Sequence, residues 1–166
     1  MGQVLPEMVR GYTHQSAMKL CPETVKVLKD ISSVNGAMFT IMKPKSQLTH
    51  HIDPVAISLR YHLGLSTPNS DACYINVDGE KYAWRDGEAF MFDETYLHYV
   101  RNDSDQPRLI LMCDMERPMS IFGSLFNIAY KFLASFSVVP NMEGDKRGLA
   151  ISCFPVLHPP WQRPKP

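Results

Sequence analysis

Three residues of this chain have the types and spacing of a metal site: His51, Asp53 and, 45 residues after Asp53, His98. In an extended strand the side chains alternate between faces, so residues 51 and 53 point the same way with Cα atoms roughly 6.5 Å apart. Two histidines and one carboxylate leave about three positions of an ion open, which is the ligand set of non-haem Fe(II) oxygenases. The pattern predicts an oxygen-activating enzyme, although a histidine taken alone is more often an ordinary surface or core residue.

The sequence around these residues has the pattern of short β-strands. Apolar or alternating stretches of strand length occupy residues 37–42, 57–65, 73–77, 80–84, 89–92, 96–101 and 108–114. Asp78-Gly79 and Asp86-Gly87 separate neighbouring stretches and are typical of β-hairpins. Short strands with turn signals at this spacing favour an antiparallel barrel or jelly roll over an α/β sheet. The fold class is therefore expected to be mainly β, and the mouth of such a barrel is a usual place for a small-molecule site.

A helix is predicted on each side of this strand-rich region. Pro22-Glu23-Thr24 begins the N-terminal one, which runs to Lys29 or Ile31, because proline is favoured in the first helical turn. Residues 119–139 carry apolar side chains at helical intervals and predict the C-terminal one. We expect it to pack on the barrel; alternatively, 119–136 lies on a membrane or grips an apolar substrate. Polar residues interrupt the roughly 20 apolar residues that a membrane span needs.

Length and composition bound the organisation and the partners. A chain of 166 residues suits one domain, with a lead-in and helix (1–36), a jelly-roll core (37–118), the C-terminal helix (119–139) and a proline-rich tail (140–166). Lys plus Arg and Asp plus Glu both number 17, so no net field favours nucleic acid as a partner. The four cysteines include no Cys-x-x-Cys pair, which indicates reduced thiols. The N-terminus lacks the pattern of a secretory signal, so we expect a cytoplasmic protein, with membrane association as the alternative.

Basic side chains on other predicted strands suggest an anion beside the metal site. Arg60 and His62 lie within 57–65, and Arg108 begins 108–114. Burying an arginine beside a core costs several kcal/mol unless an anion or a hydrogen-bond partner compensates for it. A co-substrate that carries a carboxylate would supply that partner. Alternatively, Arg108 pairs with Asp103 or Asp105 at the surface.

Two longer stretches resemble a known family. They are MFTIMKPKSQLTHHIDPVAISLRYHLGLSTP and EKYAWRDGEAFMFDETYLHYVRNDSDQPRLILMCDMERPM. Their LRYHLGL, WRDGE, FDETYxH and RP elements resemble, in order and spacing, those of the aspartyl/asparaginyl β-hydroxylases, and the resemblance covers residues 21–118. This family of oxygenases includes peptidyl-aspartate hydroxylases and bacterial enzymes that hydroxylate lipid A acyl chains. The resemblance implies a cupin-like double-stranded β-helix and dependence on Fe(II), 2-oxoglutarate and O2.

The resemblance also implies roles for single residues. His51 and His98 match the two iron-binding histidines. The co-substrate residues are Arg108, which grips the distal carboxylate of 2-oxoglutarate, Thr40 beside it, His62, and Arg60 lining the pocket. No catalytic side chain is expected beyond the metal centre. Hydrogen bonds to the outer nitrogens of the two histidines are expected, with Asp93 or Glu94 as a candidate for one of them.

Two residues depart from the best-known members of the family and bear on the substrate. Asp53 stands where animal members have Gly, so it is expected either to ligate the iron or to act from the outer shell. Ser58 stands where peptidyl-aspartate hydroxylases carry Arg to hold the substrate carboxylate. This replacement and the apolar segment 119–136 favour a lipid acyl chain as substrate. The alternatives are a peptidyl or free amino acid, or a non-catalytic cupin-like module that binds metal.

Overall fold

The computed structural model describes residues 4–9, 12–13, 15–53 and 56–125, and about half of them lie in strands. The strands are β1 (Val4–Val9), β2 (Tyr12–Thr13), β3 (Val34–Met42), β4 (Ser46–His51), β5 (Ser58–Ser66), β6 (Cys73–Val77), β7 (Glu80–Ala83), β8 (Ala89–Phe92), β9 (His98–Asn102) and β10 (Arg108–Glu116), and the helices are α1 (Gln15–Leu20) and α2 (Pro22–Lys29). The seven predicted strands are confirmed as β3 and β5 to β10. The predicted N-terminal helix is confirmed as α2.

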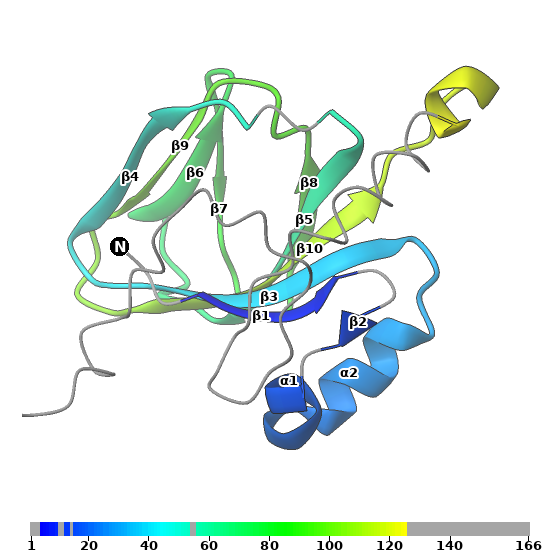
Figure 1. Cartoon of the computed structure of the whole chain (residues 1–166). Coiled ribbons are helices and arrows are strands. Elements are labelled where there is room, and N and C mark those ends of the chain that lie inside the picture. The colour runs from blue at the N-terminus through cyan, green and yellow to red at the C-terminus, as the bar shows by residue number, and fades with distance from the viewer. Residues whose placement is uncertain (1–3, 10–11, 14, 54–55, 126–166) are drawn as a thin grey trace, which may run out of the picture.

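The strands form two antiparallel sheets that face each other (Figure 1). One sheet has the order β2-β1-β3-β10-β5-β8 and the other has the order β4-β9-β6-β7. From β3 onward the chain passes repeatedly from one sheet to the other, which is the topology of a double-stranded β-helix. The predicted jelly-roll, cupin-like fold is therefore confirmed. Its strands begin at Val34, slightly before the predicted boundary at residue 37.

Both faces of the larger sheet are covered. The inner face meets the smaller sheet in a core of Met42, Cys73, Ile75, Val77, Trp84, Val100 and Ile110. The outer face packs on α2 through a second core of Leu28, Val34, Ala37, Leu111 and Cys113. In β5 the apolar row that includes Tyr61 and Leu63 joins this outer core. The alternate row, Ser58, Arg60 and His62, therefore faces the barrel interior, where a polar side chain needs a partner.

Of the two predicted hairpins, the first is confirmed and the second is wrong. Asp78 and Gly79 have φ values of 49° and 95° and join β6 to β7, which pair with each other. Asp86-Gly87 lies between β7 and β8, which belong to different sheets. The Asp86 carboxylate accepts hydrogen bonds from the backbone N–H of Thr67 (2.6 Å) and from Asn69 Nδ2 (3.0 Å). The turn is thus bound to the segment after β5 and carries the chain between the sheets.

The N-terminal region contains more structure than its sequence pattern predicts. Residues 1–20 have no clear period, yet β1 pairs with β3 and with β2, and α1 precedes α2. At the other end, residues 121–125 are helical, and the remainder of the predicted helix 119–139 lies outside the described residues, as does the tail 140–166. Within the described ranges, no helix combines the length and the apolar character that crossing a membrane requires.

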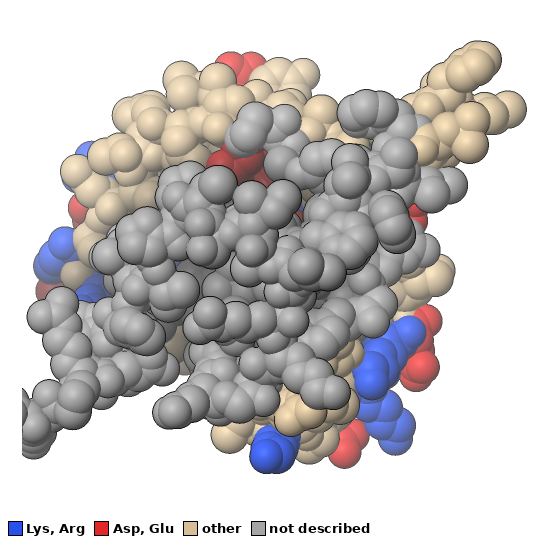
Figure 2. Space-filling view, viewed as in Figure 1, with Lys and Arg blue, Asp and Glu red and all other residues tan. Residues whose placement is uncertain are grey.

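Charged side chains of both signs lie close together on the visible surface around α1 and α2 (Figure 2). In α2, for example, the first turn carries Glu23 and the last turn carries Lys26 and Lys29. This mixture agrees with the balanced composition of the whole chain. It gives this part of the surface no field of a single sign that would attract a polyanion.

Candidate metal centre

Neighbouring strands of the smaller sheet bring the three candidate metal ligands together. His51 ends β4, His98 begins β9, and the two residues are Cα partners in the antiparallel pairing of these strands. Their ring centroids lie 4.2 Å apart. Asp53 follows β4, and its backbone N–H donates to the Glu94 carbonyl at 3.0 Å. One nitrogen of each imidazole and one oxygen of the carboxylate all lie within 4.8 Å of one another.

The outer nitrogen of each histidine is held by a backbone carbonyl two residues earlier. His51 Nδ1 lies 2.7 Å from the Thr49 oxygen, and His98 Nδ1 lies 2.9 Å from the Tyr96 oxygen. A carbonyl only accepts, so each Nδ1 donates, and each Nε2 remains as the nitrogen able to bind a metal. The candidate role of Asp93 or Glu94 in these hydrogen bonds is therefore wrong: the local backbone supplies them.

Burial favours the neutral form of His98. Its side chain is almost fully buried, and burial lowers its pKa below the usual value, with the neighbouring His51 adding to the effect. A neutral imidazole is the form that donates an electron pair to a metal. His51 and Asp53 are partly exposed, so the side of the cluster away from the barrel interior is open to solvent.

Arg60 lies beside the cluster and is surrounded by carboxylates. Its Nη2 lies 3.4 Å from Asp53 Oδ2 and also pairs with Glu94, while its Nε lies 3.1 Å from Asp114 Oδ1. Glu94 is 1% exposed and also accepts a hydrogen bond from Ser58 Oγ at 3.1 Å. Burial raises the pKa of both the Glu94 and the Asp114 carboxyl groups.

Arg108 lies inside the barrel and has no carboxylate partner among the described residues. It is 6% exposed, donates from Nη2 to Thr40 Oγ1 at 3.1 Å, and stacks its guanidinium on Trp84 at 4.3 Å from the ring centroid. Burial lowers its pKa to about 10, so it remains a cation at neutral pH. The surface alternative is wrong, because Asp103 pairs with Arg101 and Asp105 pairs with Lys45.

His62 is a second buried polar residue in the barrel interior. It is 5% exposed, and neither ring nitrogen has a hydrogen-bond partner within the described part of the chain. Burial and the nearby Arg108 hold its pKa well below the usual value, so it is neutral at pH 7. Its ring lies between Trp84, Phe90 and Phe92, at centroid distances of 5.2–5.9 Å. A neutral imidazole here offers one donor and one acceptor to a molecule in the barrel.

These features meet the requirements of the groups that the resemblance implies. The cluster offers two neutral imidazole donors and a carboxylate, a donor set that suits a divalent transition metal. In the interior, the ring nitrogens of His62, Trp84 Nε1 and Arg108 Nε are all buried without a hydrogen-bond partner. Buried polar groups in native proteins are rarely left unsatisfied, so this set fits a polar, anionic molecule in the barrel interior.

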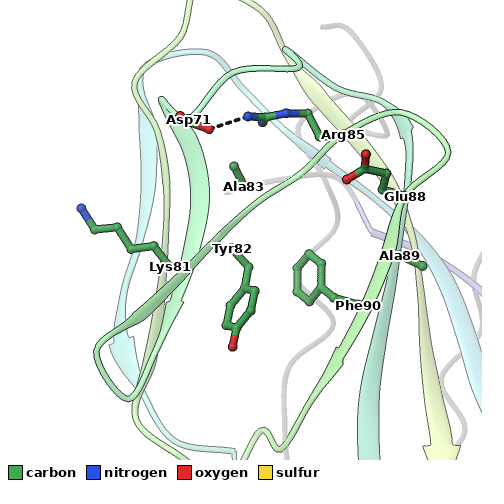
Figure 3. Close-up of a pocket in the computed structure, with 8 residues that line it drawn as sticks. All are labelled: Asp71, Lys81, Tyr82, Ala83, Arg85, Glu88, Ala89 and Phe90. Atoms are coloured by element: carbon green, nitrogen blue, oxygen red, sulfur yellow. Dashed lines mark hydrogen bonds and ion pairs between the residues drawn. The ribbon is translucent and has the colours of Figure 1, made fainter.

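A cleft of about 370 Å³ lies elsewhere, between β7 and β8 at the edges of the two sheets (Figure 3). Tyr82 and Phe90 stack in it at 5.6 Å, and Arg85 pairs with Asp71 at its rim. No predicted site residue lines this cleft. The Phe90 ring also contacts His62, so one aromatic side chain separates the cleft from the interior.

The model of one protein family, described as aspartyl/asparaginyl beta-hydroxylase, matches residues 4–118. The chain belongs to the aspartyl/asparaginyl β-hydroxylase family. The match includes every predicted site residue and also β1, β2, α1 and α2, whereas the resemblance noted in the sequence begins at residue 21. The strands that carry the candidate metal ligands and Arg108 therefore lie within the part of the chain that the family model matches.

Among the relatives is the ornithine lipid ester-linked acyl 2-hydroxylase of Rhizobium tropici, which is 34% identical over 128 residues, or 76% of this chain and 46% of that protein. The aspartyl/asparaginyl beta-hydroxylase of Mus musculus is 31% identical over 114 residues, or 66% of this chain and 15% of that protein. The chain thus spans less than half the length of either hydroxylase.

Solved structures with a similar fold include a Cupin_2 domain of an XRE family transcriptional regulator from Enterobacter cloacae. It has 14% identity, a TM-score of 0.47, and coverage of 70% of this chain and 98% of that domain. Another is a predicted oxalate decarboxylase from Thermotoga maritima, with 13% identity, a TM-score of 0.43, and coverage of 69% and 95%.

Sequence reasoning missed Trp84 and Asp114 at the candidate site, and it gave Glu94 a different role. Trp84 covers the Arg108 guanidinium, while Glu94 and Asp114 hold Arg60. The alternation of β10 could have indicated Asp114, because residues 108, 110, 112 and 114 share one face. Glu94 and Trp84 lie next to turns, where no period predicts the direction of a side chain.

Proposed function

We propose that this protein is an Fe(II)- and 2-oxoglutarate-dependent dioxygenase that hydroxylates an unactivated C–H bond. One observation carries the proposal: Arg108 is buried beside Thr40 without a carboxylate partner in the described structure, in the barrel whose mouth bears the His51, Asp53 and His98 cluster. A module that only binds metal has no use for a buried guanidinium, which is costly to desolvate. A dicarboxylic acid that chelates the metal and reaches inward would pair with it.

Each group of residues has a role in this proposal. His51, Asp53 and His98 would hold Fe(II), which when bound supplies oxygen activation coupled to decarboxylation of 2-oxoglutarate. Arg108 and Thr40 would bind the distal carboxylate through charge-assisted hydrogen bonds. His62 would donate a hydrogen bond to the same molecule. Phe90, Phe92 and Trp84 would line the space and exclude water from it, which strengthens the polar contacts inside.

We propose a lipid acyl chain as the substrate, rather than a peptidyl or free aspartate. An aspartyl substrate needs a cation near the metal, but Ser58 is neutral and donates to Glu94, and Arg60 is engaged by carboxylates. Near the cluster, Ile52, Tyr96 and Leu97 have exposed fractions of 57%, 53% and 48%, an apolar rim that suits an alkyl chain. The name of the Rhizobium tropici relative also refers to an acyl chain.

The cofactor assignment predicts a spectroscopic change. Adding 2-oxoglutarate to the protein and Fe(II) under anaerobic conditions should produce the weak visible charge-transfer band of a chelated complex, because the three ligands leave positions open for it. Absorption spectroscopy measures the band, and succinate should not produce it. An unchanged spectrum, with Fe(II) binding demonstrated separately, would exclude 2-oxoglutarate as the co-substrate.

The substrate class can be tested by mass spectrometry. Lipid extracts and aspartyl peptides are incubated with the protein, Fe(II), 2-oxoglutarate and O2, and the products are searched for a gain of one oxygen. We expect the gain in acyl chains and not in the peptides, because no unpaired cation among the described residues lies beside the candidate metal ligands to hold a peptide carboxylate. A gain in the peptides alone would contradict the acyl assignment but leave the oxygenase chemistry in place.

A further inference from the structure

Each nitrogen of the Arg60 guanidinium lies close to a neighbour within the protein. Nη2 donates to Asp53 and Glu94, and Nη1 donates to Met112 Sδ at 3.2 Å. Nε lies 3.1 Å from Asp114 Oδ1, an ion-pair distance without hydrogen-bond geometry. The planar guanidinium presents its donors in a fixed fork, so these contacts together fix its orientation. Arg60 thus lies in a fixed orientation directly beside the candidate metal ligand Asp53.

The two oxygens of the Asp53 carboxylate face different partners. Oδ1 lies 4.0 Å from His51 Nε2, the nitrogen that faces the cluster, whereas Oδ2 lies 3.4 Å from Arg60 Nη2. The backbone of Asp53 is also held, because its N–H donates to the Glu94 carbonyl at 3.0 Å. One oxygen is therefore turned toward a metal between the imidazoles, and the other is turned toward the guanidinium.

We propose that Arg60 is a positioning residue that keeps Asp53 a monodentate metal ligand. This inference rests on the proposed function, because it presupposes that the cluster binds a metal. Arg60 holds Oδ2 away from the metal, and Glu94 and Asp114 hold Arg60. Glu94 is 1% exposed, and Asp114 is the Cα partner of Arg60 in the pairing of β5 with β10, so neither anchor is free to move away.

The number of open coordination positions explains why this arrangement matters. Two histidines and one carboxylate oxygen leave about three positions of an octahedral ion, enough for a chelating co-substrate and O2. A bidentate Asp53 would occupy one of them. By holding Oδ2, Arg60 preserves the open positions on which the oxygenase chemistry depends.

Positioning of Asp53 by Arg60 is distinct from binding the distal carboxylate of the co-substrate, which is the role proposed for Arg108. Arg60 lies opposite Asp114 on β10, and Arg108 is six residues earlier on the same strand. The two arginines thus serve opposite ends of the barrel interior. A variant of Arg60 should act on the metal through Asp53, whereas a variant of Arg108 should act on the co-substrate.

The test uses Arg60→Lys and Co(II), a visible probe for the Fe(II) site, without any assay of activity. Lysine keeps the positive charge near the metal but lacks the fork that holds three carboxylates at once. We expect the Kd for Co(II), measured by calorimetry, to rise about tenfold, as for other groups that orient a ligand. The visible d–d absorption should shift, because a bidentate Asp53 would replace a water ligand of Co(II) with a second carboxylate oxygen.

A second background separates positioning from a general effect on the fold. In the Asp53→Ala protein, adding Arg60→Lys should change the Kd for Co(II) by less than about twofold, because the residue through which Arg60 acts is missing. The matched control is Arg117→Lys, which alters an arginine that pairs with Asp93 (2.6 Å) and donates to the Ser58 carbonyl (3.3 Å). This control should leave both the Kd and the spectrum unchanged.

Three results would overturn the inference. An Arg60→Lys protein with the wild-type Kd and spectrum would show that Asp53 needs no such support. If Asp53→Ala still weakened Co(II) binding in that case, the proposed metal site would stand and only the role of Arg60 would be rejected. Equal weakening in the presence and absence of Asp53 would mean that Arg60 acts through the fold. A wild-type protein that binds no Co(II), or binds it independently of Asp53, would remove this inference together with the proposed metal site.

Discussion

Arg108→Met should raise the Kd for 2-oxoglutarate of the Fe(II)-loaded protein by roughly 30-fold to several thousandfold, since truncating one partner of a buried charge pair costs about 2–5 kcal/mol. The Kd for Fe(II) alone should change little, because the guanidinium contacts Thr40 and Trp84 and no candidate metal ligand. Anaerobic titrations that follow the visible charge-transfer band measure the Kd for 2-oxoglutarate, and anaerobic calorimetry measures the Kd for Fe(II). Equal weakening of both would indicate misfolding rather than loss of a co-substrate contact.

The same variant should not be less stable than the wild type. In the described structure Arg108 is 6% exposed and contacts the Thr40 hydroxyl and the Trp84 indole ring, with no carboxylate partner. Replacing a buried charge of this kind with an apolar side chain of similar volume is often neutral, or stabilising by about 1–4 kcal/mol. Thermal unfolding of the apo protein therefore provides an independent check: lost binding with retained stability identifies a ligand site.

Arg108→Lys is the matched control for charge. It keeps a cation in the barrel but loses the planar stacking on Trp84 and the paired N–H donors. We expect it to bind 2-oxoglutarate more tightly than Arg108→Met and more weakly than the wild type. If the lysine variant bound no better than the methionine variant, geometry rather than charge would dominate the contact.

The sequence predicted the fold for identifiable reasons, whereas the roles of the candidate site residues came mainly from the resemblance to the family and stay predictions. The alternation in β5 is strict, so it correctly grouped Arg60 with His62, whereas in β10 the apolar run after Arg108 indicated the strand and placed Arg108 at its start. The same alternation could not identify which row faces solvent. In this structure neither row does, because α2 covers the apolar face and the smaller sheet covers the polar one. That arrangement depends on contacts between segments far apart in the chain.

Pairings over long distances account for the rest. His51 and His98 meet only because β4 pairs with β9, and Arg60 meets Asp114 only because β5 pairs with β10. A dipeptide such as Asp86-Gly87 predicts a turn correctly but gives no indication of which sheet the next strand joins. Likewise, β1 and β2 have little local pattern and are held by their partners.

Asp53→Ala should lower the affinity for Fe(II) by at least about tenfold. Loss of an outer-shell partner alone costs about 10–100-fold, and this substitution removes a direct ligand. It should also free Arg60, whose Nη2 faces the Asp53 carboxylate at 3.4 Å. Calorimetry with Fe(II) under anaerobic conditions, and with Mn(II) as a redox-stable probe, measures the effect.

Two further variants make the result specific to ligation. Asp53→Glu keeps the charge but moves the carboxylate by one methylene, so it should recover only part of the affinity if the oxygen binds the metal directly. Asp105→Ala, which removes an exposed carboxylate paired with Lys45 at 3.0 Å, controls for net charge and should have no effect. If Asp53→Ala retained wild-type affinity, the two histidines would suffice and Asp53 would belong to the outer shell. The cluster would then match the animal members of the family, to which the resemblance assigns two histidines alone as iron ligands.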